Sequence, residues 1–299
     1  MDAENNLEMY YMDLVPILTK LKNGLLQVRP ELDYSDFGSD KKRERNYKDY
    51  YLIDYKNNCF DNPVKVKLGS GTRAIKSSAA FIYNIFGKDS INFEGKNYKQ
   101  IQFEKGLDAL LRRPKAQLDG YLLSEDETKE IFFETKLLEW SGTPKDLAIA
   151  YLEENNYPTE NKHSKEFISF FKSIVDENKK TERKGVERVA HKTKVYDAIQ
   201  MTIHILGIYN ALCKNELKSK NIELINLVWD YDHPRYNKEA DEAKDFIQKT
   251  KKTLIPFFNE FDISFQIRYI PFSDFINKVK FLNPKRLDYL KKRYLFKYL

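Results

Sequence analysis

Two carboxylates and a lysine stand where a predicted β-hairpin would bring them together. The runs 117–123 (QLDGYLL) and 131–140 (IFFETKLLEW) are apolar and rich in residues that suit strands, and a charged turn separates them. Asp119 lies in the first run, and Glu134 and Lys136 lie in the second. Because side chains alternate along a strand, Glu134 and Lys136 share one face. Antiparallel pairing across the turn then places Asp119 near Glu134.

This set of side chains suits hydrolysis of a phosphodiester bond. Two carboxylates hold Mg²⁺, which keeps waters and phosphate oxygens among its other ligands. A bound metal acidifies water, orients the scissile phosphate and stabilises charge on the leaving oxygen. Lys136 would orient the attacking water or offset phosphate charge. The predicted cofactor is therefore Mg²⁺, with Mn²⁺ as a substitute.

An acid-x-Lys triplet is common in a lysine-rich chain, so the context carries the argument. The strongest rival is Asp54 in the apolar run YYLIDYK, but no apolar strand ending in an acid precedes it. The plainer alternative for Glu134 and Lys136 is a surface ion pair on an ordinary hairpin. Other triplets, among them those at Glu94, Glu127, Glu177 and Glu216, lie in polar, turn-like or helix-end segments.

The surrounding elements are predicted from hydrophobic periodicity. Helices are expected over 5–22, 74–86 (ended by Gly87), 98–112, most of 144–182, 191–213, 237–261 and 284–299. Residues 64–68 and 263–272 alternate like strands, and 222–231 is a continuous apolar run typical of a strand buried on both faces. The segment 89–96 resembles a turn. This order predicts an α/β layer with helices on both faces.

The charge is unevenly distributed along the chain. Lys and Arg number 51 and Asp and Glu 45 in 299 residues, a net charge of +6, and the excess lies within 270–299. A basic end on a neutral body is a candidate phosphate-facing patch. The candidate nucleic-acid contacts are Lys194, Lys291, Lys292 and Arg293. The alternative is a solvated, lysine-rich terminal helix.

Composition excludes several classes of protein. No apolar run is long enough to span a bilayer, and the N-terminal residues lack the pattern of a signal peptide. Cys59 and Cys213 are far apart, which disfavours a disulfide framework and fits the cytoplasm. No nucleotide-binding loop or serine-hydrolase motif occurs, and the four histidines are scattered. We therefore expect a cytoplasmic protein with no membrane partner.

The acid-bearing strand followed by a turn and a Glu-x-Lys strand resembles the PD-(D/E)XK nuclease superfamily, which has the restriction-endonuclease-like fold. The resemblance covers about residues 74–231. The segment 77–87 (SSAAFIYNIFG) and the pair Phe103-Glu104 resemble a bacterial branch of that superfamily. Two features depart from its pattern: Leu118 stands where the family name has proline, and the third strand of the meander is not obvious after Trp140.

The resemblance implies roles for five residues. Asp119 and Glu134 would be metal ligands, Lys136 the catalytic lysine, and Glu104 an additional acid at the metal. Gln200 would be the polar residue of the second core helix, with His204 on the same face. The alternatives are a solvated Glu104 and a buried structural amide at Gln200.

The expected architecture is an α/β restriction-endonuclease-like core with helical additions at both ends. An accessory segment would span 1–73, the nuclease core 74–275 with a helical insertion over about 141–190, and a basic helix 276–299. The expected function is a metal-dependent endodeoxyribonuclease acting on DNA in restriction or defence, as a homodimer or with a partner subunit. The alternative is a non-catalytic nucleic-acid-binding module, or a nuclease subunit active only in a larger assembly.

Overall fold

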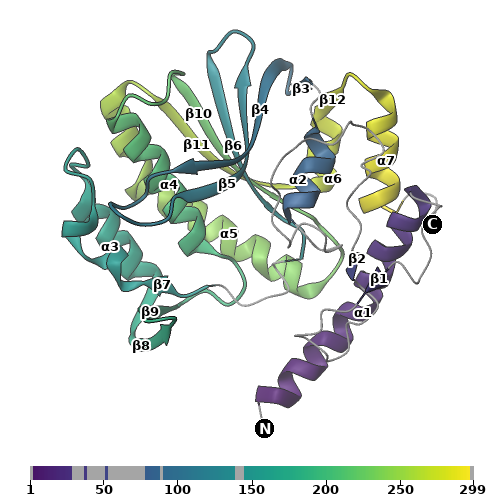
Figure 1. Ribbon diagram of the computed structural model, residues 1–299, viewed down its shortest axis with the longest axis horizontal. Coiled ribbons are helices and arrows are strands. Elements are labelled where there is room, and N and C mark those ends of the chain that lie inside the picture. Colours follow the sequence, from purple (N-terminus) through teal and green to yellow (C-terminus); the bar gives the residue numbers. More distant parts are fainter. Residues whose placement is uncertain are drawn as a thin grey trace. The chain divides into compact units, whose positions relative to one another are not determined.

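The computed structural model describes residues 3–28, 37–38, 51–52, 78–87, 90–138 and 145–296 (Figure 1). The chain forms two compact units. One consists of Lys96–Pro271, and the other of Met1–Gly95 together with Phe272–Leu299. The strand expected over 64–68 lies outside the described residues.

The unit Lys96–Pro271 is built on a mixed sheet with helices around it, so the α/β prediction is confirmed (Figure 1). Its strands lie in the order β11-β10-β6-β5-β4. The strands β4, β5 and β6 form an antiparallel meander, whereas β10 runs parallel to both β6 and β11. Their bounds are β4 Lys96–Leu107, β5 Ala116–Ser124, β6 Lys129–Lys136, β10 Asn221–Val228 and β11 Ser264–Pro271.

The meander corrects one prediction. Residues 98–112 are not a helix, because β4 pairs with β5 from Gln100↔Leu123 to Leu107↔Ala116. The apolar spacing of this segment resembles a helix, but the long-range pairing determines its conformation. The third meander strand therefore precedes the predicted hairpin instead of following it. The hairpin itself is confirmed, with β5 antiparallel to β6.

The segment 145–191 is only partly helical, contrary to the expectation for 144–182. It holds η5 (Ile149–Leu152), η6 (Glu154–Asn156) and α3 (Ser164–Ile174). It also holds a small sheet in the order β7 (Leu147–Ala148), β9 (Val186–His191), β8 (Val175–Arg183). The strand β8 is almost entirely charged and polar, so its conformation comes from pairing with β9 and not from an apolar pattern.

The helix α4 (Ala198–Cys213) is the central helix of this unit. It is apolar on nearly all sides, which is typical of a buried helix. The Asp197 carboxylate caps its first turn by accepting the backbone N–H of Gln200 at 3.0 Å. A Cβ at Gly207 would lie 3.0 Å from the Cβ of Leu107, so glycine allows a close approach between α4 and the end of β4.

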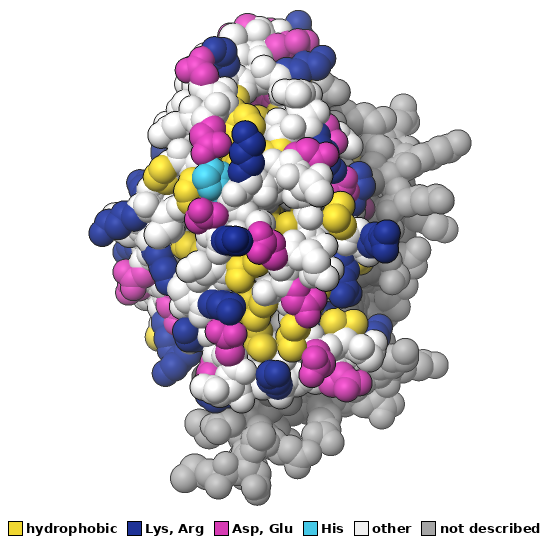
Figure 2. Space-filling model, turned by 90° about the vertical axis from the view of Figure 1, so that its left-hand side faces the viewer, with side chains coloured by type: hydrophobic (Ala, Val, Ile, Leu, Met, Phe, Trp, Pro, Cys, Tyr) yellow, Lys and Arg dark blue, Asp and Glu magenta, His cyan; other side chains and the backbone are white. Residues whose placement is uncertain are grey.

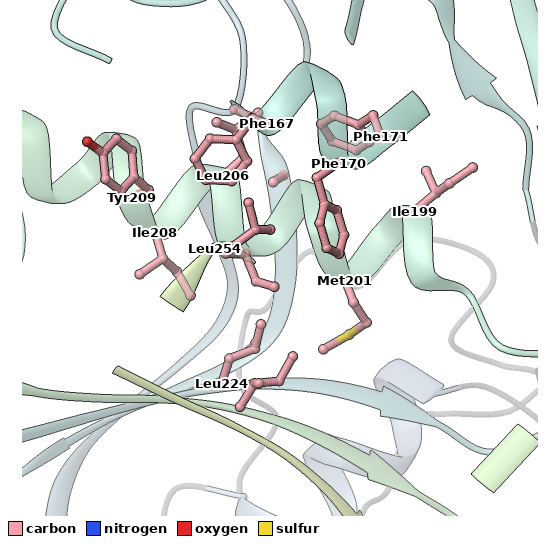
Figure 3. Close-up of a cluster of buried hydrophobic side chains, with 14 of the residues drawn as sticks. Phe167, Phe170, Phe171, Ile199, Met201, Leu206, Ile208, Tyr209, Leu224 and Leu254 are labelled. Carbon is pink, nitrogen blue, oxygen red and sulfur yellow. The ribbon is translucent and has the colours of Figure 1, made fainter. Parts of the chain in front are cut away.

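The hydrophobic core of this unit packs around α4 (Figure 3). Phenylalanines of α3, among them Phe167 and Phe171, contribute from one helix, and Leu224 contributes from β10. The helix α5 (Pro234–Thr253), followed by η7 (Ile255–Phe261), adds further apolar side chains to the same cluster. This packing fixes α4 relative to the sheet, and therefore fixes any polar side chain that α4 presents to β6.

The second unit contains the two ends of the chain. Its elements are α1 Ala3–Val28, β1 Phe37–Gly38, β2 Tyr51–Leu52, α2 Ser78–Phe86, β3 Ile91–Phe93, α6 Phe272–Lys278, β12 Val279–Phe281 and α7 Pro284–Tyr294. The predicted end of α2 is confirmed: Gly87 has φ +53° and donates its N–H to the Tyr83 carbonyl at 2.7 Å. The turn expected over 89–96 is wrong for 91–93, which pair with β12.

In the described part of the chain, no helix combines the length and apolarity needed to cross a membrane.

Candidate active site

The β5–β6 hairpin ties Asp119 to the strand that carries Glu134. The ladder pairs end at Gly120↔Phe133, one residue before Asp119 and Glu134 would face each other. Beyond that pair, one Asp119 oxygen accepts both the backbone N–H and the hydroxyl of Thr135, each at 2.7 Å. The carboxylate thus takes an N–H that a continued ladder would give to a backbone carbonyl, and it is held at the edge of β6.

Glu134 and Lys136 lie on one face of β6, as the strand alternation predicts. Both are buried, and Lys136 Nζ donates to Glu134 Oε1 at 2.6 Å. The same ammonium donates to Gln200 Oε1 at 2.7 Å. Gln200 comes from the first turn of α4, so the strand and the helix together fix the lysine.

His204 completes the cluster and is the member that the sequence indicated least. Its Nε2 lies 2.9 Å from Glu134 Oε2, and the ring is buried. An ionised carboxylate only accepts hydrogen bonds, so Nε2 carries the proton. The buried Nδ1 has no hydrogen-bond partner among the described residues. The signal available in the sequence was the shared helical face of Gln200 and His204, four residues apart.

The pKa values of the two carboxyl groups, Asp119 and Glu134, are shifted in opposite directions. Burial, with a smaller contribution from the charge of Glu134, raises the pKa of Asp119 to about 8. Burial also raises the pKa of Glu134, but the charges of Lys136 and His204 and their hydrogen bonds outweigh it and lower that pKa to about 2. At neutral pH the site therefore holds a protonated Asp119 beside an ionised Glu134. Neighbouring acids whose pKa values are shifted apart in this way are typical of functional sites.

Glu104 is not brought into the cluster. It lies on β4, between the ladder pairs Phe103↔Gly120 and Lys105↔Leu118, so its register position faces Asp119. Its side chain is exposed, and no hydrogen bond joins it to the described residues of the site. Its φ of +52° is a left-handed conformation that side chains disfavour.

The predicted nucleic-acid contacts lie in different surroundings. Lys194 is exposed in the loop before α4, and its backbone N–H is bound by Glu242 Oε1 at 3.2 Å. Lys291 is partly exposed, and Lys292 pairs with Asp288 at 2.8 Å. Arg293 is only 3% exposed and donates to the Leu21 carbonyl at 2.7 Å. Its charge thus serves the packing of α7 and is not presented to solvent.

The residues present fit a loosely held divalent cation better than an enclosed metal site. No group of three or more His, Cys, Asp or Glu side chains arranged for a metal occurs among the residues that the structure describes. Both oxygens of Glu134 are engaged, by Lys136 and His204. The second oxygen of Asp119 accepts no hydrogen bond from described residues. Mg²⁺ is commonly bound through one or two carboxylates, with waters filling its other positions.

Comparisons of the chain with protein-family models, with curated proteins and with solved structures gave no match. The fold and the site therefore define the chain only as an α/β protein with a buried cluster of acidic, lysine, glutamine and histidine side chains. Any function must be argued from that cluster.

Proposed function

We propose that the chain is a metal-dependent endodeoxyribonuclease of the PD-(D/E)XK type, with a restriction-endonuclease-like core. The observation that carries the proposal is the buried Lys136 ammonium held between Glu134 and Gln200 at the end of β6, with Asp119 on the neighbouring strand. Burying these ionisable groups together costs stability unless all of them are well paired. A site selected for chemistry explains why the cost is tolerated.

Each side chain has a defined part in this proposal. Asp119 and Glu134 would hold Mg²⁺ or Mn²⁺, which when bound supplies an acidified water and neutralises charge on the phosphate. Lys136, oriented by Gln200, would hold the attacking water or the phosphate oxygen. His204 fixes the carboxylate plane of Glu134. Asp119 would give up its proton as the cation binds, because the charged cation favours the ionised carboxylate.

The substrate and the setting are part of the same proposal. DNA is the proposed substrate, and restriction or defence the proposed role. Two active sites facing opposite strands can cut a duplex in one binding event, so we propose either a homodimer or a complex with a partner subunit. Exposed Lys194 and the partly exposed Lys291 and Lys292 remain proposed contacts to DNA.

The test is nicking of supercoiled plasmid at low salt, first with Mg²⁺ and then with Mn²⁺. We expect relaxation by the wild-type protein and at least a hundredfold loss, on the order of general acid–base or electrostatic effects, in Lys136→Ala. Lys129→Ala is the matched control, since Lys129 lies on the same strand and also pairs with a buried carboxylate, that of Glu223. Equal cutting by wild type and Lys136→Ala would refute the assignment of the site.

Metal binding is tested separately from cutting. Mg²⁺ or Mn²⁺ that binds the native state should raise the melting temperature by mass action. We expect this shift to disappear in Asp119→Ala and to persist in Lys129→Ala. An identical shift in Asp119→Ala would place the cation elsewhere.

The second candidate is a non-catalytic nucleic-acid-binding module with the same fold. One observation favours it: Lys136 already occupies the Glu134 oxygen that a metal would need. Plasmid retention on a gel that is independent of metal, without nicking by any variant, would support this alternative.

A further inference from the structure

The loop between β4 and β5, residues 108–115, presents two adjacent, exposed arginines. Arg112 and Arg113 are exposed, and neither guanidinium forms a hydrogen bond or ion pair with the residues that the structure describes. Lys115 follows them with its side chain 56% exposed and only a long contact of 3.5 Å to Asp108. Leu111 beside them is 44% exposed, which is unusual for a large hydrophobic side chain.

Adjacent exposed basic residues also occur at Arg183-Lys184 and Lys251-Lys252, so the place of this loop, and not its charge alone, distinguishes it. Figure 2 shows a face on which, among the described residues, basic and acidic side chains alternate with small hydrophobic areas. On such a surface, exposure of one basic residue indicates little. Two adjacent arginines that pair with no carboxylate of the described residues leave a local positive charge available to an external anion.

The base of this loop is firmly anchored. The buried Asn210 amide donates to the carbonyls of Asp108 and Ala109, both at 2.9 Å. The backbone N–H of Leu111 donates to the Asn156 carbonyl at 2.7 Å. Ala109 is also fully buried. The arginines therefore extend from a fixed platform, and binding through them would not require the base of the loop to become ordered first.

Arg112 also has a strained backbone. Its φ is +54°, a left-handed conformation that a residue with a Cβ adopts only where the surroundings impose it. Glycine would relieve this strain, yet arginine stands at this position. Lys184 in the β8–β9 turn has the same φ of +54°, so the backbone conformation shapes the loop without distinguishing Arg112.

The loop lies at the same end of the hairpin as the candidate active site. The last β4–β5 pair is Leu107↔Ala116, and Asp119 follows Ala116 by three residues. At about 3.3 Å per residue, Asp119 is roughly 10 Å along β5 from the end of the loop. Because β6 runs antiparallel to β5, Lys136 at the end of β6 is at this end too.

We propose that residues 111–115 bind the phosphate backbone of duplex DNA beside the candidate active site. Arg112 and Arg113 would contact phosphates, and Leu111 would lie against the sugar edge of a groove. The choice of DNA rests on the proposed nuclease function. A planar guanidinium with several N–H donors matches a phosphate, and arginines beside an exposed apolar side chain are typical of proteins that contact the minor groove.

The test measures binding without cutting, by fluorescence anisotropy of a short labelled DNA duplex in EDTA over a range of salt concentrations. The variant is Arg112→Gln/Arg113→Gln. If each arginine neutralises one phosphate, the slope of log K against log salt should shrink by about 1.8, at about 0.9 per phosphate. The matched control is Arg183→Gln/Lys184→Gln in the exposed β8–β9 turn, which removes the same charge and should leave the slope unchanged.

Several outcomes would overturn the proposal. The wild type could fail to bind the duplex, or the loop variant could keep the wild-type slope. The control variant could lose as much slope as the loop variant, or the loop variant could lose the same slope on an RNA duplex of the same sequence. Thermal melting of each variant shows that it is folded. A reduced slope without any plasmid nicking would support the loop contact while the nuclease proposal fails. Plasmid nicking together with an unchanged slope in the loop variant would support the nuclease proposal and overturn the loop contact.

Discussion

Glu130 and Glu134 lie four residues apart on the same face of β6, and both are buried, at 1% and 2% exposure. Glu130 Oε1 accepts the backbone N–H groups of Lys218 and Ser219, at 2.9 and 3.0 Å. Glu134 instead accepts from two ionisable side chains, Lys136 and His204. Backbone amides neither change their protonation nor leave their place, whereas side chains do both.

This difference separates a structural carboxylate from one suited to chemistry. Glu130 fixes the segment after α4 to the start of β6, and an amide could accept the same bonds. Glu134 belongs to a cluster in which protons and partners are exchangeable, and the neighbouring Asp119 has its pKa raised to about 8. The two ends of one strand thus provide an internal control for the proposed site.

The largest effect is expected from Glu134→Ala. Removal of this carboxylate leaves the buried Lys136 ammonium without a charged partner, so the free energy of unfolding should fall by about 3–5 kcal/mol. Urea denaturation measures the loss. The control Glu134→Leu/Lys136→Met replaces the whole pair by apolar groups and should recover most of it. A loss below about 1 kcal/mol for Glu134→Ala, as for a surface pair, would contradict burial of the pair.

Glu130→Ala should cost less and act only on stability. It leaves two backbone N–H groups without their acceptor, for an expected loss of about 1–3 kcal/mol in urea denaturation. Metal-dependent nicking, if present in the wild type, should be unchanged at a temperature where the variant is folded. Loss of nicking in a folded Glu130→Ala protein would remove the distinction between the two ends of β6.

A pH dependence of stability is expected from Asp119, whose half-buried carboxyl group lies against Thr135 at the edge of β6. Its pKa is about 8 in the folded protein and about 4 when unfolded, so between these values the native state retains a proton that the unfolded state has lost. The contribution of protonated Asp119 to the free energy of unfolding is therefore fully present below pH 4 and is lost as the pH rises towards 8. Glu134 acts oppositely and only at low pH, since its folded pKa is about 2.

The measurement is urea denaturation at several pH values from 5 to 8, comparing wild type with Asp119→Asn. The asparagine variant cannot ionise, so its free energy of unfolding relative to the wild type should rise with pH. A difference that stays constant over this range would show that the pKa of Asp119 is not raised.

The smallest effect is expected from Lys129→Ala. Lys129 pairs with Glu223 at 2.7 Å, but Arg268 pairs with the same carboxylate at 2.7 Å and would remain. We expect a loss of at most about 1 kcal/mol in thermal or urea denaturation. A loss comparable to that of Glu134→Ala would mean that Arg268 does not compensate and that the two ends of β6 are equally sensitive.

Local sequence patterns were enough to predict several parts of the site. The alternation of QLDGYLL and IFFETKLLEW around a charged turn predicted the hairpin, and the shared face of Glu134 and Lys136 followed from it. The apolar run at 222–231 predicted β10, and helical spacing predicted α4 and placed Gln200 and His204 on one face. These features depend on periodicity within one element, which a short stretch of sequence records.

Other features depend on partners that are distant in the chain, and these follow from the folded arrangement. Residues 98–107 form β4 because β5 offers a ladder, although their own spacing resembles a helix. The strand β8 forms in a charged segment for the same reason. Arg293 is buried because α7 packs on α1, and His204 becomes part of the site because the core holds α4 over β6. Pairing and packing energies between segments far apart in the chain leave no local pattern, so periodicity does not reveal them.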